Sequence, residues 1–414
     1  MAAGTSRKSW LSLTLAVAAT LPGLSIRVGL VHPPVGVETL LYGVAIMGAA
    51  FLLAWAAEVA QLDVSQTLAI AVLAIIAVLP EYAVDLFLAF RAGQGDEDAR
   101  HFAVANMTGA NRLLIGIGWA TVVLVFWFRS QRREVRLRAV QRIDVGYLVL
   151  ATLWAFTIPL RGELSFLDLL ILGTLFVAYI FRAAREEVEE PELIGAAALL
   201  GSLPRLPRRI TTVVLFLFSA VAILASAEPF VHGLERIGED LGINPFLMIQ
   251  WVAPLASESP EMVVAILFTL RLKAQAGLGT LISSKVNQWT LLVGTLPLVF
   301  AIGGGAGGGF LAPLEMDHRQ VEEVFLTAAQ SLFAVVVIAN LSISRVEAVA
   351  LLALFLGQLG FEATPVRYGF AITYILFAVG MLIVRKEARR GLWDSLVHVV
   401  RPGRGTERGG AGGG

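Results

Sequence analysis

The stretch from Ala253 to Leu270 reads APLASESPEMVVAILFTL, and it places two carboxylates, Glu258 and Glu261, in an otherwise apolar segment. An ionised carboxylate at the centre of a bilayer costs about 2.5–3.5 kcal/mol on insertion scales. Pro260, between the two, removes a backbone donor and frees a carbonyl, which at that depth is tolerated mainly where the backbone lines a cavity. We therefore expect this segment to form one half of a cation site inside a membrane.

The composition indicates an all-α polytopic membrane protein. Of the 414 residues, 57% are hydrophobic and 15% are charged, and the mean hydropathy is +0.76, whereas about 25% of residues are charged in an ordinary soluble domain. The chain has no cysteine and no H-x-x-x-H pair among its five histidines, which disfavours thiol chemistry and a zinc enzyme. No phosphate-binding G-x-x-x-x-G-K-[ST] loop occurs, so an ATP-driven pump is also disfavoured.

Twelve apolar runs have the length that a membrane-spanning helix needs. They lie at 10–31, 38–60, 66–90, 102–128, 144–160, 164–183, 209–228, 243–270, 276–302, 320–341, 345–361 and 366–385. Arginine and lysine gather in alternate loops and at both ends of the chain, so the positive-inside rule predicts a multi-pass cell-membrane protein with both termini cytoplasmic. The first run could instead be a cleaved signal peptide, but Arg27 and the prolines at 33 and 34 favour a retained helix.

These runs divide the chain into two five-helix halves with an extra helix at each end. The predicted parts are an N-terminal transmembrane helix (1–37), a first repeat (38–183), a cytoplasmic linker (184–208), a second repeat (209–361), a C-terminal transmembrane helix (362–386) and a cytoplasmic disordered tail (387–414). Glycine dominates the end of the tail, which is why we expect disorder there.

The second half repeats features of the first half. IAVLPEYAVD (76–85) and ASESPEMVV (256–264) each place a Pro-Glu pair in an apolar run. Each is followed by a segment rich in small and amide residues, VANMTGANRLLIGIG (104–118) and LGTLISSKVNQWTLLVG (278–294). The two units start about five runs apart, an odd number, so they enter the membrane in opposite senses. Inverted repeats that meet at the midplane are typical of secondary transporters.

With these motifs the chain resembles the calcium/cation antiporter superfamily, which includes sodium/calcium and calcium/proton exchangers. The repeats of that family carry a G-T-S-x-P-E-like motif followed by a G-N-x-x-G-S-N-like motif. The best matches are 256–261 and 105–111, with Pro80-Glu81 and 279–285 as partial copies. The resemblance covers roughly 38–361 and implies a core of ten helices in two inverted fives.

The chain departs from the family pattern at four positions. Ala77 and Val78 stand where the first repeat of the family has hydroxyl residues, and Leu114 stands where it has Asn or Asp. Gln288, at the corresponding place in the second repeat, is more similar to the calcium/proton branch. The coupling ion therefore remains open between Na⁺ and H⁺.

Calcium is bound by six to eight oxygens of carboxylates, carbonyls and amides. Glu81 and Glu261 are expected to face each other across the pseudo-twofold axis. Asp85 lies four residues after Glu81, and Glu258 three before Glu261, so each shares the helix face of its neighbour. Further ligands are expected from the amides and hydroxyls of the same motifs, namely Asn106, Thr108, Asn111, Ser257, Ser284 and Gln288.

Two cations, Arg112 and Lys285, lie at nearly equivalent points of the two repeats. Four carboxylates against these two cations leave two negative charges, which one divalent ion would balance. Our hypothesis is that Arg112 and Lys285 occupy the space and charge that sodium ions fill in sodium-coupled relatives. In the alternative interpretation, Glu81 and Glu261 form structural ion pairs with these cations.

The sequence thus predicts a secondary antiporter, not an enzyme, that exchanges Ca²⁺ for H⁺ or Na⁺ by alternating access and needs no cofactor. Two alternatives are antiport of Mg²⁺ or Mn²⁺, which the ligand types also allow, and an intramembrane aspartyl protease. The protease is less favoured because no Gly-x-Gly-Asp-type motif surrounds Asp85, Glu258 or Glu261. The expected partners are membrane lipid and small inorganic cations, with no nucleic acid. The oligomeric state is left open.

Overall fold

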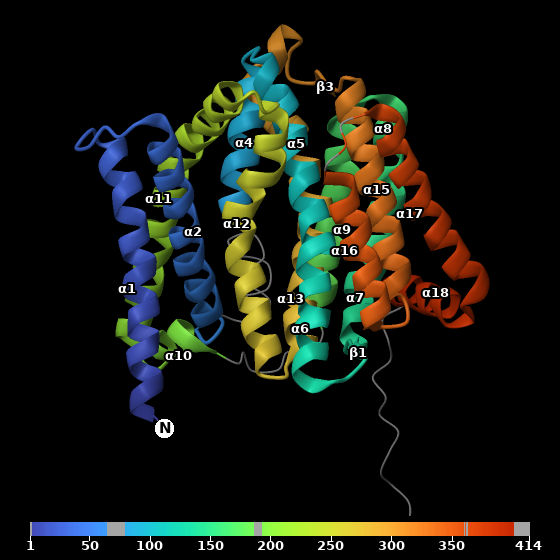
Figure 1. The fold of residues 1–414 in the computed structure, drawn as a ribbon, viewed down its shortest axis with the longest axis horizontal. Coiled ribbons are helices and arrows are strands. Elements are labelled where there is room, and N and C mark those ends of the chain that lie inside the picture. Colours follow the sequence, from blue (N-terminus) through green and yellow to red (C-terminus); the bar gives the residue numbers. More distant parts are fainter. Residues whose placement is uncertain (1, 64–78, 186–192, 360, 362, 401–414) are drawn as a thin grey trace, which may run out of the picture.

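The computed structural model describes residues 2–63, 79–185, 193–359, 361 and 363–400, and nearly all of them lie in helices (Figure 1). The predicted all-α class is therefore confirmed. Long apolar runs favour helices because a lipid-embedded backbone must satisfy its hydrogen bonds within the segment.

The elements follow one another in two comparable series. The first half contains α1 (Ala2–Arg27), α2 (Val35–Ala60), α4 (Leu79–Gly93), α5 (Glu97–Leu113), η1 (Leu114–Trp119), α6 (Ala120–Ser130), β1 (Glu134–Arg136), η2 (Ala139–Gln141), α7 (Arg142–Ala155), α8 (Thr157–Arg161), β2 (Glu163–Leu164) and α9 (Phe166–Ala183). The second half contains α10 (Gly195–Gly201), α11 (Arg205–Leu241), α12 (Pro245–Leu270), α13 (Ala274–Asn287), η3 (Gln288–Leu292), α14 (Val293–Gly303), η4 (Gly305–Gly307), β3 (Leu314–Glu315), α15 (His318–Ile338), β4 (Ser342–Ser344), α16 (Arg345–Leu359), α17 (Thr364–Val384) and α18 (Lys386–Val400). In each half one long helix has a π-helical segment, η1 or η3, at its middle.

Among the described residues, ten helices are long and apolar enough to cross a membrane. They correspond to ten of the twelve predicted runs. The other two runs, 66–90 and 345–361, contain α4 and α16, each 15 residues long. Residues 64–78 lie outside the described part of the chain, so the count of twelve spans stays a prediction.

The predicted disordered tail is wrong for residues 387–400, which form α18 together with Lys386. One face of this helix is buried against α7 and the end of α15. A Cβ built at Gly391 would lie 2.0 Å from the carbonyl oxygen of Ala339, and one at Gly146 would lie 2.7 Å from that of Ser395. Gly146 and Gly391 permit this close contact. The charge and the glycine content of the C-terminal segment alone did not indicate it. Residues 401–414 lie outside the described residues.

Two short antiparallel ladders connect the halves of the chain. β1 pairs with β4, and β2 pairs with β3. β1 precedes α7 in the first repeat, and β3 precedes the corresponding helix α15 in the second. β2 precedes α9 in the first repeat, and β4 precedes the corresponding helix α16 in the second. Each ladder thus pairs a strand of one repeat with the non-corresponding strand of the other repeat, and the two ladders are equivalent. A twofold relation between the repeats requires this arrangement. Figure 1 shows β1 and the start of α1 at one end of the molecule and β3 at the other.

The helices form two groups with α4 and α12 between them. α1, α2 and α11 pack together at one edge, and α7, α9, α15, α16 and α17 lie toward the other (Figure 1). Beyond the end of α2, Asp63 accepts hydrogen bonds from Arg208 at 2.7 and 2.9 Å and from Arg209 at 3.1 Å. Hydrogen bonds from Arg208 lower the pKa of Asp63 to about 2, so this carboxylate stays ionised and fixes α2 to α11.

Glycines let the central helices approach closely. A Cβ built at Gly93 of α4 would lie 2.0 Å from the carbonyl oxygen of Phe300, and one at Gly303 of α14 would lie 2.3 Å from that of Phe90. At Gly109 of α5 it would lie 1.8 Å from the carbonyl oxygen of Gln250 in α12. Small residues at helix crossings are the usual means of tight packing within a membrane.

We expect Gly109→Ala to destabilise the protein by about 1–3 kcal/mol, because α5 must move away from α12 to admit the methyl group. The measurement is the midpoint of heat-induced loss of monodisperse protein in detergent. Gly369→Ala in α17 is the matched control, since its Cβ would meet no atom within 4 Å. Equal midpoints for the two variants would contradict the close crossing.

Candidate ion-binding site

The predicted acidic segments lie on α4 and α12, between the two groups of helices (Figure 1). α12 continues from Pro245 to Leu270 through both Pro254 and Pro260, so neither proline interrupts the helix. Each proline removes only one backbone donor, and the carbonyls four residues earlier, at Gln250 and Ala256, lose their helical partners. The chain thereby obtains free carbonyls without breaking the helix.

The four predicted carboxylates belong to one cluster. Glu81, Asp85 and Glu258 are buried, and Glu81 interacts electrostatically with Glu258, Asp85 and Glu261. Residues far apart in the chain are thus brought together as the repeat pattern predicts. Among the described residues, no three carboxylate or imidazole groups are already arranged to hold one metal ion together.

Amide side chains from the following helices contact two of these acids. Asn106 of α5 donates to Asp85 Oδ1 at 2.9 Å, and Gln288 of η3 donates to Glu258 Oε1 at 2.6 Å. The arrangement is the same in both halves: an amide of the helix that carries the π segment holds an acid of the preceding helix. Each amide fixes one carboxylate oxygen and leaves the other available.

Many buried polar atoms around the cluster have no hydrogen-bond partner within the described part of the chain. They are both oxygens of Glu81, Asp85 Oδ2, Glu258 Oε2, Glu261 Oε2, Asn106 Oδ1, Gln288 Oε1 and Ser284 Oγ. Buried oxygens without donors are costly unless a proton, water or cation meets them. The donor set, carboxylates with amide and hydroxyl oxygens, is the one that hard divalent cations prefer.

The remaining predicted ligands make contacts within the protein. Thr108 donates to the Val104 carbonyl at 2.7 Å and accepts from Gln250 at 3.3 Å. The Ser257 hydroxyl bonds back to the Ala253 carbonyl at 3.4 Å. A role for these two side chains as ligands stays a prediction.

The structure separates the two predicted cations. Lys285 is fully buried and interacts electrostatically with Glu81 and Glu258. Its ammonium donates to Asn111 Oδ1 at 2.6 Å and to the Asn111 carbonyl at 3.3 Å, and it lies 4.2 Å from the centre of the Trp289 ring. Asn111 is therefore the partner of this cation as well as a candidate ligand.

Arg112 turns away from the carboxylate cluster toward α15. Its guanidinium pairs with Glu323 and lies 4.8 Å from the centre of the Trp251 ring. Glu323 also pairs with Arg319 at 3.2 Å and with Arg367 of α17 at 3.3 Å. The near equivalence of Arg112 and Lys285 in sequence thus does not extend to their surroundings.

This second charged network was missed by sequence reasoning. Glu322 and Glu323 stand at the start of an apolar run, and Arg367 at the start of another, where interfacial residues are ordinary. Their burial results from packing between α5, α15 and α17, which no local pattern indicates. The one available signal was Arg112 itself, a buried cation that needs a partner.

A model of the family described as sodium/calcium exchanger protein matches residues 35–184 and 211–363. The chain belongs to the sodium/calcium exchanger family. The two matched ranges run from α2 through α9 and from α11 through α16, so that α1, α17 and α18 lie outside them. The predicted superfamily is confirmed. A comparison with curated proteins found no match.

Solved structures agree with this membership. The H⁺/Ca²⁺ exchanger CAX is 44% identical, with a TM-score of 0.90 over 96% of this chain and 98% of that one. The sodium-calcium exchanger NCX_Mj is 18% identical, with a TM-score of 0.52 over 80% of this chain and 99% of that one. YfkE is 16% identical, with a TM-score of 0.57 over 88% of this chain and 99% of that one. The last two show a shared exchanger fold.

Replacing Glu323 by alanine is expected to destabilise the exchanger by about 3–5 kcal/mol, because it leaves the buried Arg112 and Arg367 without a common anion. Thermal unfolding in detergent measures this loss. The control is Glu97→Ala, which removes an acid that is 82% exposed and 3.5 Å from Arg100, and should cost at most about 1 kcal/mol. If both variants unfold at the wild-type temperature, the network does not stabilise the fold.

Proposed function

We propose that the chain is a secondary antiporter that exchanges Ca²⁺ for H⁺ across a membrane. The observation that carries this proposal is the cluster of four carboxylates, three of them buried, that α4 and α12 contribute from the two halves of the chain. The 44% identity with a structure named as an H⁺/Ca²⁺ exchanger supports both the ion and the coupling.

The cluster can bind either a divalent ion or protons. Calcium would be held by oxygens of Glu81, Asp85, Glu258 and Glu261, with free carbonyls and amides completing the six to eight ligands that it needs. Protons compete with the ion for the same carboxylate oxygens, so binding of the ion releases protons. Exchange follows if the site opens to one side of the membrane at a time.

Lys285 supports a proton as the counter-ion. Four carboxylates and one ammonium leave three negative charges when all are ionised, since Arg112 is paired with Glu323. Either one Ca²⁺ with one proton or three protons alone balance that charge, so each Ca²⁺ that binds displaces two protons. The ammonium also places a fixed cation beside Glu81 and Glu258, where a sodium ion would otherwise add positive charge.

Several expectations from the sequence form part of the same proposal. We also propose that both termini lie on the cytoplasmic side, and the basic residues around β1 and β4, at the end of the molecule where α1 starts, support this. The working partners are lipid and small inorganic cations, and no resident cofactor is required. Mg²⁺ and Mn²⁺ are competing cargo ions to be tested alongside Ca²⁺.

The test is ⁴⁵Ca²⁺ uptake into proteoliposomes, with a pH gradient imposed in one set and a Na⁺ gradient in another. We expect uptake under the pH gradient only, and at least a tenfold loss of it in Glu81→Gln and Glu261→Gln, which keep the shape of the side chain but remove its charge. Uptake competition by Mg²⁺ and Mn²⁺ reports cargo selectivity. If folded wild-type protein showed no ⁴⁵Ca²⁺ uptake under either gradient, the antiporter assignment would be contradicted.

The role of Lys285 is tested by Lys285→Gln in the same assay. Because this change removes the cation beside Glu81 and Glu258, we expect the requirement for a pH gradient to weaken and Na⁺ to begin to affect Ca²⁺ uptake. Lys285→Arg, which keeps the charge, should preserve the wild-type preference. Unchanged coupling in Lys285→Gln would show that the ammonium only stabilises the fold.

A further inference from the structure

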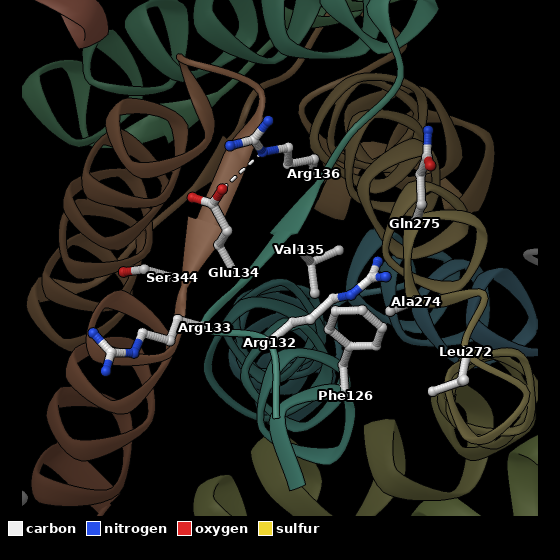
Figure 2. A pocket seen from close by; sticks show the side chains of 10 residues that line it. All are labelled: Phe126, Arg132, Arg133, Glu134, Val135, Arg136, Leu272, Ala274, Gln275 and Ser344. Atoms are coloured by element: carbon white, nitrogen blue, oxygen red, sulfur yellow. Dashed lines mark hydrogen bonds and ion pairs between the residues drawn. The ribbon is translucent and has the colours of Figure 1, made fainter. Parts of the chain in front are cut away.

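A basic cavity opens at the end of the molecule where β1 pairs with β4 (Figure 2). Its volume is about 620 Å³. The walls come from the end of α6, from β1, from the turn between α12 and α13, and from the end of β4. The lining residues are Phe126, Arg132, Arg133, Glu134, Val135, Arg136, Leu272, Ala274, Gln275 and Ser344.

The charge of this cavity is positive. Its lining contains three arginines and one acid, Glu134, and that acid is bound by Arg136 at 2.7 Å. Within the described ranges the guanidinium groups of Arg132 and Arg133 form no ion pair. The lining therefore has two cationic groups that no carboxylate of the described chain neutralises.

Arg132 is the residue that faces the interior of the cavity. Figure 2 shows its side chain reaching across from the start of β1 toward Ala274 and Gln275, while Arg133 lies on the side of Ser344. Ala274 and Gln275 begin α13, a helix of 14 residues, and their backbone N–H groups have no backbone partner among the described residues, whereas those of the next two residues donate to the Lys273 carbonyl. A guanidinium, a side-chain amide and helix N–H groups thus surround one space, and all three are donors that suit phosphate oxygens.

The apolar residues around the opening indicate where the phosphate comes from. Leu272 lines the cavity and is 56% exposed, and Leu270, two residues earlier in the chain, is also an exposed apolar side chain. Both lie at the end of α12, a helix long and apolar enough to cross a membrane, where the chain turns through Arg271 and Lys273. Basic pockets between membrane helices at the cytoplasmic side are suited to anionic headgroups.

We propose that this cavity binds the phosphate of an anionic phospholipid in the adjacent leaflet. Arg132 holds the phosphate against the start of α13, and the acyl chains lie along Leu272 and Leu270. The lipid then contacts the first repeat through α6 and β1 and the second through α13. It is a site separate from the carboxylate cluster and independent of the exchange chemistry proposed above.

The test is binding of a fluorescent phosphatidylglycerol to the full-length protein in zwitterionic detergent micelles, measured by fluorescence anisotropy. Arg132→Gln is expected to weaken binding roughly fivefold, the factor that corresponds to about 1 kcal/mol for one arginine near an anionic lipid. Arg132→Lys should recover most of the affinity because the charge remains. Each variant is first shown to be monodisperse.

Arg129→Gln is the matched control, because it removes the same charge from an exposed position in the last turn of α6, outside the cavity lining. Its affinity should stay within twofold of wild type, and unlabelled phosphatidylcholine or millimolar inorganic phosphate should displace little of the probe. If Arg129→Gln and Arg132→Gln weakened lipid binding equally, the proposed site would be overturned. The lipid would then be attracted diffusely to the basic residues around β1. Full displacement by inorganic phosphate would overturn the lipid assignment, since the cavity would then take a free anion.

Discussion

The structure depends on keeping four acidic side chains inside a membrane. A buried carboxylate loses several kcal/mol of solvation, so every element near the cluster offers compensation. Asn106 and Gln288 each bind one carboxylate oxygen, and Lys285 supplies a cation that is itself held by Asn111 and Trp289. None of these compensating groups satisfies the cluster completely. In the proposed ion site these unsatisfied oxygens are the ones that would bind a cation, since a fully paired set of acids would gain little from one.

The two buried cations illustrate how a repeated sequence gives unequal surroundings. Lys285 and Arg112 occupy similar places in their halves, yet only Lys285 interacts with Glu81 and Glu258. Arg112 is held by Glu323, which in turn is bound by Arg367 of α17, a helix outside the matched family ranges. Among the described residues the carboxylate cluster therefore interacts with the buried cation of one repeat, Lys285, while that of the other repeat, Arg112, is paired with Glu323.

Much of the fold could be predicted from apolar runs and loop charges, because lipid allows few alternatives to a helix. The Pro-Glu pairs likewise predicted that α4 and α12 meet, and the acids do form one cluster. The sequence could not indicate that α12 runs through Pro260 unbroken, since the neighbouring helices decide whether a proline interrupts a helix. It also misjudged α18, whose buried face depends on glycine contacts with α7 and α15 rather than on its own composition. Ion pairs between residues far apart in the chain, such as Arg112 and Glu323, produce no local sequence pattern from which they could be predicted.

The reciprocal ladders between β1 and β4 and between β2 and β3 have a mechanical consequence. They join the two repeats at opposite ends of the molecule, and the helices that follow the four strands, α7, α9, α15 and α16, all belong to the same group. Sliding of the two repeats past each other within that group would break ladder hydrogen bonds. Neither ladder involves α2 or α11. These two helices are linked instead by Asp63, which accepts hydrogen bonds from Arg208. The molecule therefore has two parts, one in which the ladders join the two repeats and one that contains α2 and α11. The acidic helices α4 and α12 lie between these parts.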